Sequence, residues 1–208
     1  PWAVVGPVVA LANPGTAISE ADYLLGYGPW LDPTPAGVVD YLPGHNSAYK
    51  RAVLLQYGPA LAARLRAECV LHRELRAQGY QLYLEPAART HHVSISTLAS
   101  WLPALFYSGR AFAAERARSG RWSVLRRLLY TGGATLIPLV RLRRCLRDLD
   151  RDGRRGKSLP RMLPALLLGL AASALGEAVG CAGGSGDPPQ RLADIEMHRH
   201  RHVARQDK

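Results

Sequence analysis

Apolar and polar residues follow two different patterns along the chain, and the change comes near residue 96. Residues 1–43 hold short apolar pieces among many Gly and Pro residues, which predicts loops and two short strands rather than a long helix. In residues 50–66 the apolar positions recur at helical spacing, and Gly58 and Pro59 divide this run into two predicted helices.

A helix–glycine–strand succession follows. Apolar residues at helical spacing over 68–78 predict another helix, and Gly79 is placed where a glycine commonly ends one. Residues 80–86 alternate between apolar and polar, which predicts a strand that ends at Pro86. This order of elements is typical of a layered α/β domain, so residues 1–96 are expected to be part of one.

Long apolar runs mixed with Arg predict helices over residues 97–182. The most apolar stretch, 162–175, has about fourteen uncharged residues, fewer than the ~20 needed to cross a bilayer. We therefore expect α-helices that lie in the membrane interface, with Arg side chains reaching the headgroups. A buried core helix would give the same pattern for 162–175. Residues 183–208, rich in Gly, Pro and His, are expected to form a flexible basic tail.

The formal charge of +11 is concentrated in one segment. Residues 110–161 hold 15 Lys and Arg and 4 acids, and 15 − 4 = +11, so the rest of the chain is formally neutral. This distribution predicts a polyanionic partner, either an anionic membrane surface or nucleic acid, although a solvated Arg-rich face would look the same. Nucleic acid is disfavoured, because apolar runs interrupt the arginines and only Trp122 and Tyr130 could stack on bases there.

The three cysteines carry little chemistry. Cys69, Cys145 and Cys181 are far apart and lack the spacing of metal ligands. A sparse, odd number of cysteines is typical of a reducing compartment.

Residues 42–51, with the sequence LPGHNSAYKR, form the first candidate site. Gly44 permits a tight turn, His45 and Asn46 place polar groups at its tip, and Lys50 and Arg51 begin the next helix. The alternative is an ordinary helix start capped by Asn46 or by the serine after it.

Glu68 and the His pair at 91 and 92 form the second candidate site. The apolar face of the helix that Glu68 begins is expected to pack on a sheet, which would place the carboxylate where α/β proteins bind ligands. The helix dipole would keep that carboxylate ionised, as suits a general base, but simple dipole complementarity also explains an acid in a first turn. His91 and His92 follow the strand and could equally be a polar strand end.

The order of these elements resembles the C-terminal half of the family 2 glycosyltransferases with the GT-A fold. In that family a Gly-x-Asn turn and a basic pair precede an acidic pair that opens a helix, then Gly-Tyr, a strand, a Pro-x-Ala turn and a His. The resemblance covers roughly residues 5–115, and the matching positions are Gly44, Asn46, Lys50, Arg51, Glu68, Gly79, Pro86, Ala88 and His92.

Two features depart from the family pattern. Ala67 stands where the family has the first acid of the pair, and Glu68 stands for the catalytic Asp. The strand–helix repeats and the metal-binding Asp-x-Asp would lie before Pro1, so the chain is expected to be a fragment that is inactive alone.

The resemblance implies an α/β, partial GT-A (nucleotide-diphospho-sugar transferase-like) domain followed by membrane-associated helices on the cytoplasmic face of the cell membrane. The intact enzyme would use a divalent metal, Mg or Mn, and move a sugar from a nucleotide-sugar donor to a glycan or lipid-linked acceptor in polysaccharide biosynthesis. It makes Glu68 the catalytic base, places His92 at the metal, and assigns substrate binding to Gly44, His45, Asn46, Lys50 and Arg51. The competing interpretation is a non-enzymatic basic module that binds anionic membrane, less readily nucleic acid.

Overall fold

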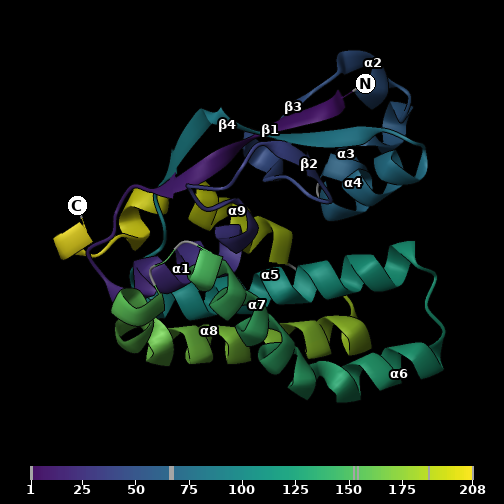
Figure 1. The fold of residues 1–208 in the computed structure, drawn as a ribbon. Coiled ribbons are helices and arrows are strands. Elements are labelled where there is room, and N and C mark those ends of the chain that lie inside the picture. Colours follow the sequence, from purple (N-terminus) through teal and green to yellow (C-terminus); the bar gives the residue numbers. More distant parts are fainter. Residues whose placement is uncertain (1, 66–67, 152, 154, 187, 208) are drawn as a thin grey trace. The chain divides into compact units, whose positions relative to one another are not determined.

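The chain folds as a mixed α/β protein, which confirms the expected class in its coarse form. The computed structural model describes residues 2–65, 68–151, 153, 155–186 and 188–207 (Figure 1). It divides into two compact units: unit 1 comprises 1–10 and 29–91, and unit 2 comprises 11–28 and 92–208. This division differs from the expected segments 1–96, 97–182 and 183–208, because residues 11–28 belong with the later helices.

Unit 1 is built on a four-stranded mixed sheet with the strand order β2-β4-β1-β3. Its strands are β1 (Trp2–Leu11), β2 (Gly37–Val39), β3 (Ala48–Tyr49) and β4 (Gln81–His92). The antiparallel pairs place Val4 opposite Tyr49 and Val38 opposite Tyr83. The predicted strand is present but continues past Pro86. Because β2 pairs with β4 only as far as Leu84, the proline lies beyond that pairing, where a strand tolerates a missing N–H.

The helices of unit 1 follow the predicted breaks. They are α2 (Arg51–Leu55), the 3₁₀ turn η3 (Gly58–Ala60), α3 (Leu61–Leu65) and α4 (Glu68–Ala77). Gly58 and Gly79 have φ values of 51° and 87°, a region that favours glycine, so both act as the expected helix breakers. The core lies between α4 and the sheet, and its fully buried members include Val4, Val8, Leu71, Leu75, Leu82 and Leu84.

Unit 2 is helical. It contains α1 (Ala17–Tyr27), α5 (Leu98–Ser119), α6 (Val124–Gly133), η4 (Ala134–Leu136), α7 (Ile137–Arg151), α8 (Arg155–Gly183), α9 (Pro188–Met197) and the 3₁₀ turns η5 (Arg199–His202) and η6 (Arg205–Asp207). The expectation of loops and strands throughout 1–43 is wrong for α1. Thr16 and Ser19 form a capping box at the start of this helix, and its apolar face is buried.

Small residues let α5 and α8 approach until their backbones touch. A Cβ added at Gly176 would lie 2.0 Å from the Phe106 carbonyl oxygen, and one at Gly180 would lie 2.2 Å from that of Arg110. A Cβ at Gly109 of α5 would likewise meet the Ser173 carbonyl oxygen of α8 at 2.3 Å. Phe106 contacts Gly176, and Arg110, four residues later, contacts Gly180, four residues later on α8. The two helices therefore run in the same direction.

Glu177 is a buried acid on α8 held between two arginines. Its carboxylate lies 3.6 Å from Arg116 and 3.6 Å from Arg141, and Arg141 also donates to Ser173 Oγ at 2.6 Å. Burial raises the pKa of the Glu177 carboxyl, and the two arginines oppose that rise. The position of this charge inside unit 2 shows that α8 has a polar partner within the protein.

Within the described part of the chain, one helix segment, Ser158–Gly183, is long and apolar enough by length and composition to cross a membrane. Half of its most apolar stretch is buried inside the protein. Leu166 and Leu170 are fully buried, whereas Leu168 and Leu175 are exposed. The structure therefore gives α8 the role of a core helix in unit 2, one of the two readings that the sequence leaves open for 162–175.

The end of the chain is tied to unit 2, which differs from the loose tail expected from residue 183 on. The Ser96 N–H donates to the His202 carbonyl at 3.0 Å, and the Ala204 N–H donates to Ser96 Oγ at 2.7 Å. Thr16 Oγ1 and Asp207 Oδ2 are 2.8 Å apart in a hydrogen bond. Such long-range hydrogen bonds leave no local pattern in the sequence from which the ordered end of the chain could be predicted.

We predict that Gly176→Ala destabilises the protein by about 1–3 kcal/mol, because its methyl group would collide with the backbone of α5. The matched control is Gly132→Ala on α6, where nothing lies within 4 Å of the added Cβ. That change should stabilise by about 0.5–1 kcal/mol, since alanine favours the helix. Urea unfolding followed by circular dichroism measures both. Equal effects of the two substitutions would contradict the close packing of α5 and α8.

Candidate functional site

The carboxylate of Glu68 fills the space beside Gly44. Glu68 is in the first turn of α4, and Gly44 begins the 3₁₀ turn η2 (Gly44–Asn46); both belong to unit 1. A Cβ added at Gly44 would lie 1.8 Å from Glu68 Cδ and 1.8 Å from Oε2. Gly44 is thus the residue that leaves room for this carboxylate, and two predicted site residues come together.

Burial opposes ionisation of the Glu68 carboxyl. Desolvation raises the pKa of its carboxyl above the ordinary value. This burial opposes the effect expected of the dipole at the start of α4, and the ionised state of Glu68 stays a prediction. A carboxylate with a raised pKa holds a proton more tightly once it has accepted one, which suits a general base.

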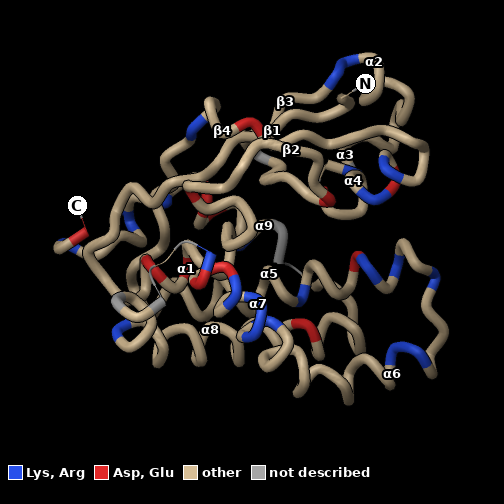
Figure 2. Tube along the Cα trace, in the orientation of Figure 1, with Lys and Arg blue, Asp and Glu red and all other residues tan. Residues whose placement is uncertain are grey.

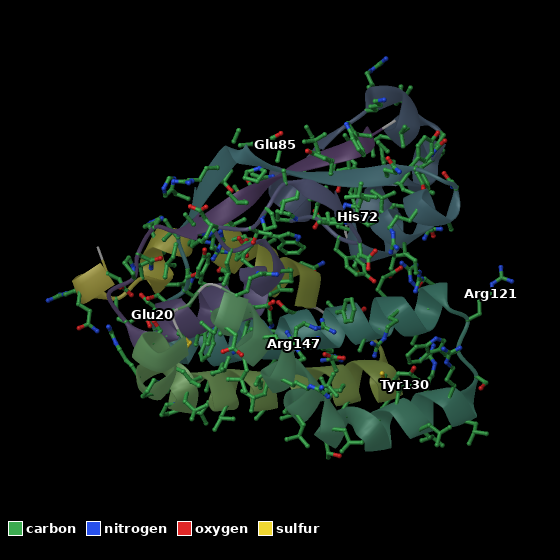
Figure 3. All side chains as sticks on the ribbon, in the orientation of Figure 1. Glu20, His72, Glu85, Arg121, Tyr130 and Arg147 are labelled. Atoms are coloured by element: carbon green, nitrogen blue, oxygen red, sulfur yellow. The ribbon has the colours of Figure 1, made fainter. Side chains whose placement is uncertain are left out.

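His72 is a polar group beside Glu68 that the sequence analysis does not single out. It lies one helical turn after Glu68 on α4, and its side chain is fully buried inside unit 1 (Figure 3). The Leu42 N–H points at its Nδ1 at 3.5 Å, and the Tyr49 hydroxyl lies 2.7 Å from its Nε2. With Nδ1 accepting, we assign the proton of the neutral ring to Nε2, which donates to Tyr49 Oη.

Burial shifts the pKa values of His72 and Tyr49 so that both groups stay neutral. It lowers the pKa of His72 from 6.5 to about 4. It raises the pKa of the Tyr49 phenol, and the negative charge of Glu68 raises it further. Glu68, His72 and Tyr49 therefore form one electrostatically connected group in unit 1.

The remaining residues of the predicted turn are exposed or lie outside the description. Asn46, Lys50 and Arg51 have exposed side chains, and the side chain of His45 lies outside the described part, as does Ala67. The capped-helix alternative for this segment is wrong, because α2 begins at Arg51 with Lys50 as its N-cap residue. The serine at 47 donates instead to the Pro43 carbonyl at 2.7 Å, which holds the turn closed.

His92 belongs to unit 2, where hydrogen bonds hold its ring. Its Nδ1 lies 3.2 Å from the Tyr27 hydroxyl, and its Nε2 accepts from Arg199 at 3.2 Å. A guanidinium at this distance opposes a divalent cation, so the residues around His92 do not fit a metal site. Among the residues that the structure describes, no group of three or more His, Cys, Asp or Glu side chains is arranged to hold a metal ion. The metal role that the resemblance gives His92 stays a prediction.

Comparisons with known proteins add no relative. No protein-family model, curated protein or solved structure matches this chain. Functional inference therefore rests on the chemistry of the described residues and on the family resemblance of the sequence.

We predict that protonation of His72 destabilises the fold as the pH falls. Because the pKa of His72 is about 4 in the folded state and 6.5 ordinarily, the unfolded chain binds the proton first between these values. The contribution of His72 to the free energy of unfolding should therefore fall by about 1.4 kcal/mol for each pH unit between 6.5 and 4. The stability difference between the wild type and His72→Gln should narrow over that range, as measured by urea unfolding at each pH.

The exposed His91 provides the control, since His91→Gln removes a histidine from the surface of β4. Its difference from the wild type should not follow the profile of His72→Gln. An NMR titration of the wild-type His72 ring gives the same answer without a variant, and a midpoint near 6.5 would contradict the buried, neutral ring.

Proposed function

We propose that this chain supplies the acceptor side of an inverting nucleotide-sugar glycosyltransferase, with Glu68 as the general base. The observation that carries the proposal is the placement of the Glu68 carboxylate of α4 against Gly44 of η2, two residues to which the family resemblance gives site roles. The raised pKa of Glu68 adds chemical support, because a general base must take up a proton during the reaction.

The proposed step balances as a single displacement. Glu68 accepts the proton of an acceptor hydroxyl, and the hydroxyl oxygen forms a bond to the anomeric carbon of the donor sugar. The bond from that carbon to the nucleotide diphosphate breaks on the opposite side, and the diphosphate leaves with the electron pair. One displacement inverts the configuration at the anomeric carbon.

Residues near Glu68 are proposed to form its buried surroundings and to bind the substrates. Buried His72 is hydrogen-bonded to the partly buried Tyr49, and the charge of Glu68 acts on the Tyr49 phenol, so this pair is the polar environment of the carboxylate within unit 1. The exposed Asn46, Lys50 and Arg51 offer an amide and two cations, which suit hydroxyl and phosphate oxygens of the substrates. A glycan or lipid-linked hydroxyl is the acceptor class that the resemblance implies.

We predict that Glu68→Gln lowers sugar transfer by roughly 100-fold or more, because the amide cannot accept the proton. The assay uses the full-length protein, a panel of radiolabelled nucleotide-sugars as donors, and membrane lipid and glycan fractions as acceptors. The matched control is Glu74→Gln on the same helix, which loses only the ion pair with Arg64 at 3.0 Å. Full transfer by Glu68→Gln, or equal losses in both variants, would sink the proposal.

Gly44→Ala tests the placement of the carboxylate rather than its chemistry. The added methyl must displace the flexible end of Glu68, so transfer should fall about tenfold, while the free energy of unfolding changes by less than about 1 kcal/mol. Gly37→Ala is the control, since nothing lies within 4 Å of a Cβ there. Unchanged transfer by Gly44→Ala would show that the position of Glu68 beside the turn has no part in catalysis.

A further inference from the structure

An apolar face extends along α6, η4 and the first turn of α7 in unit 2. Its side chains are exposed by 60% to 74% of their surface, far more than is usual for residues of this size. We call this the α6–α7 face, and its members are Val124, Leu125, Leu128, Leu129, Leu136, Leu139 and Val140.

The α6–α7 face is continuous because its members recur at helical spacing. Leu125 and Leu129 are four residues apart, as are Leu136 and Val140, and Leu129 and Leu136 are separated by two turns. Residues 124–140, with the 3₁₀ turn η4 between the two helices, span at most roughly 25 Å. Contiguous apolar surface of this extent marks a place where something docks.

The charge around this face is of one sign. Between residues 121 and 147 the chain has seven arginines and no Asp or Glu. Figure 2 shows these cations at the start of α6 and along α7. Arg121 extends from the turn before α6 (Figure 3). Arg143 and Arg144 are exposed on α7, just after the last apolar position of the face.

An aromatic pair lies at the α6 end of the face. Trp122 and Tyr130 have ring centroids 4.2 Å apart, and the Arg126 guanidinium lies over them at 4.7 Å and 5.8 Å from the two centroids. Trp and Tyr with a cation beside them are the residues that proteins place at the level of lipid headgroups.

Anionic lipid is the occupant that satisfies all of these features. A second copy of the chain would bring its own seven arginines against these, which opposes self-association through this face. Nucleic acid would pair with the arginines but leave the leucines in water. An anionic bilayer accepts the leucines among its acyl chains and the arginines at its phosphates.

We propose that the α6–α7 face docks in the plane of an anionic phospholipid membrane, with residues 124–140 lying along the interface. The docking surface does not depend on the proposed glycosyltransferase function, because it stands on unit 2 alone. It also differs from a membrane-crossing role for α8, whose Glu177 is paired inside the protein.

We predict that the protein floats with vesicles of phosphatidylcholine and phosphatidylglycerol, and much less with phosphatidylcholine alone. Leu125→Ser combined with Leu129→Ser should lower the partition coefficient at least tenfold, because two side chains no longer enter the acyl region. Leu55→Ser, which changes a leucine of unit 1 that is 54% exposed, should leave the partition coefficient unchanged. Arg143→Gln combined with Arg144→Gln should weaken binding to the anionic vesicles and reduce its dependence on salt.

Quenching of Trp122 gives a second readout of depth. Phosphatidylcholine brominated near the headgroup, mixed into the anionic vesicles, should quench wild-type fluorescence, and Trp122→Phe should remove most of that quenching. Circular dichroism checks that each variant is folded. Because the substituted side chains are exposed, we expect the variants to fold.

Three results would overturn the proposal: no flotation, flotation that the double leucine variant leaves intact, or a dimer in sedimentation equilibrium that this variant abolishes. The last result would assign the face to a second copy of the chain. Full sugar transfer by Glu68→Gln with intact vesicle binding would overturn the catalytic proposal alone. Loss of transfer in Glu68→Gln without any vesicle binding by the wild type would overturn the docking proposal alone.

Discussion

The rotation of α4 about its own axis is the constraint on which the candidate site depends. Leu71 and Leu75 are fully buried against β1 and β4, and each contributes roughly 1.5–3 kcal/mol by leaving water. Turning the helix to release Glu68 would expose both leucines. Because Glu68 and His72 are also one turn apart, they lie together on the neighbouring flank, toward Gly44 and Tyr49. Apolar burial therefore positions a carboxylate that no described ion pair holds.

Burial acts in opposite directions on the two titratable groups of that flank. It raises the pKa of Glu68 and lowers that of His72, since in both cases the charged form loses its hydration. His72 is sealed in the core and hydrogen-bonded at both ring nitrogens, whereas Glu68 is only partly buried. Of the two, Glu68 is thus the group that solvent can reach, as the proposed role of general base requires.

Local patterns in the sequence correctly predicted features that depend on neighbouring residues alone. The end of the helix at Gly79 and the strand after it follow from positive φ and from alternation, and both are present. The pairing of His72 with Tyr49 could not be predicted, because it joins positions 23 residues apart through packing. The hydrogen bonds from 96 to 202 and 204 are longer in range still, which is why the ordered end of the chain was missed. The meeting of Gly44 with Glu68 could not be predicted from spacing either, because packing brings the turn to the helix.

Hydropathy alone would select α8 as the membrane-binding element of unit 2. The exposed apolar side chains, however, lie on α6 and α7, so the membrane proposal concerns those helices. Glycines let α8 pack against the backbone of α5, and Glu177 pairs with Arg116 and Arg141 inside the protein. Half of the most apolar stretch of α8 is thus buried within the fold. The inward arginines have a partner of opposite charge there. The outward ones beside the α6–α7 face occur in a segment without acids, next to leucines that the fold leaves in water. An anionic lipid interface would bind both the exposed arginines and the exposed leucines of the α6–α7 face. This proposal requires no rearrangement of α8.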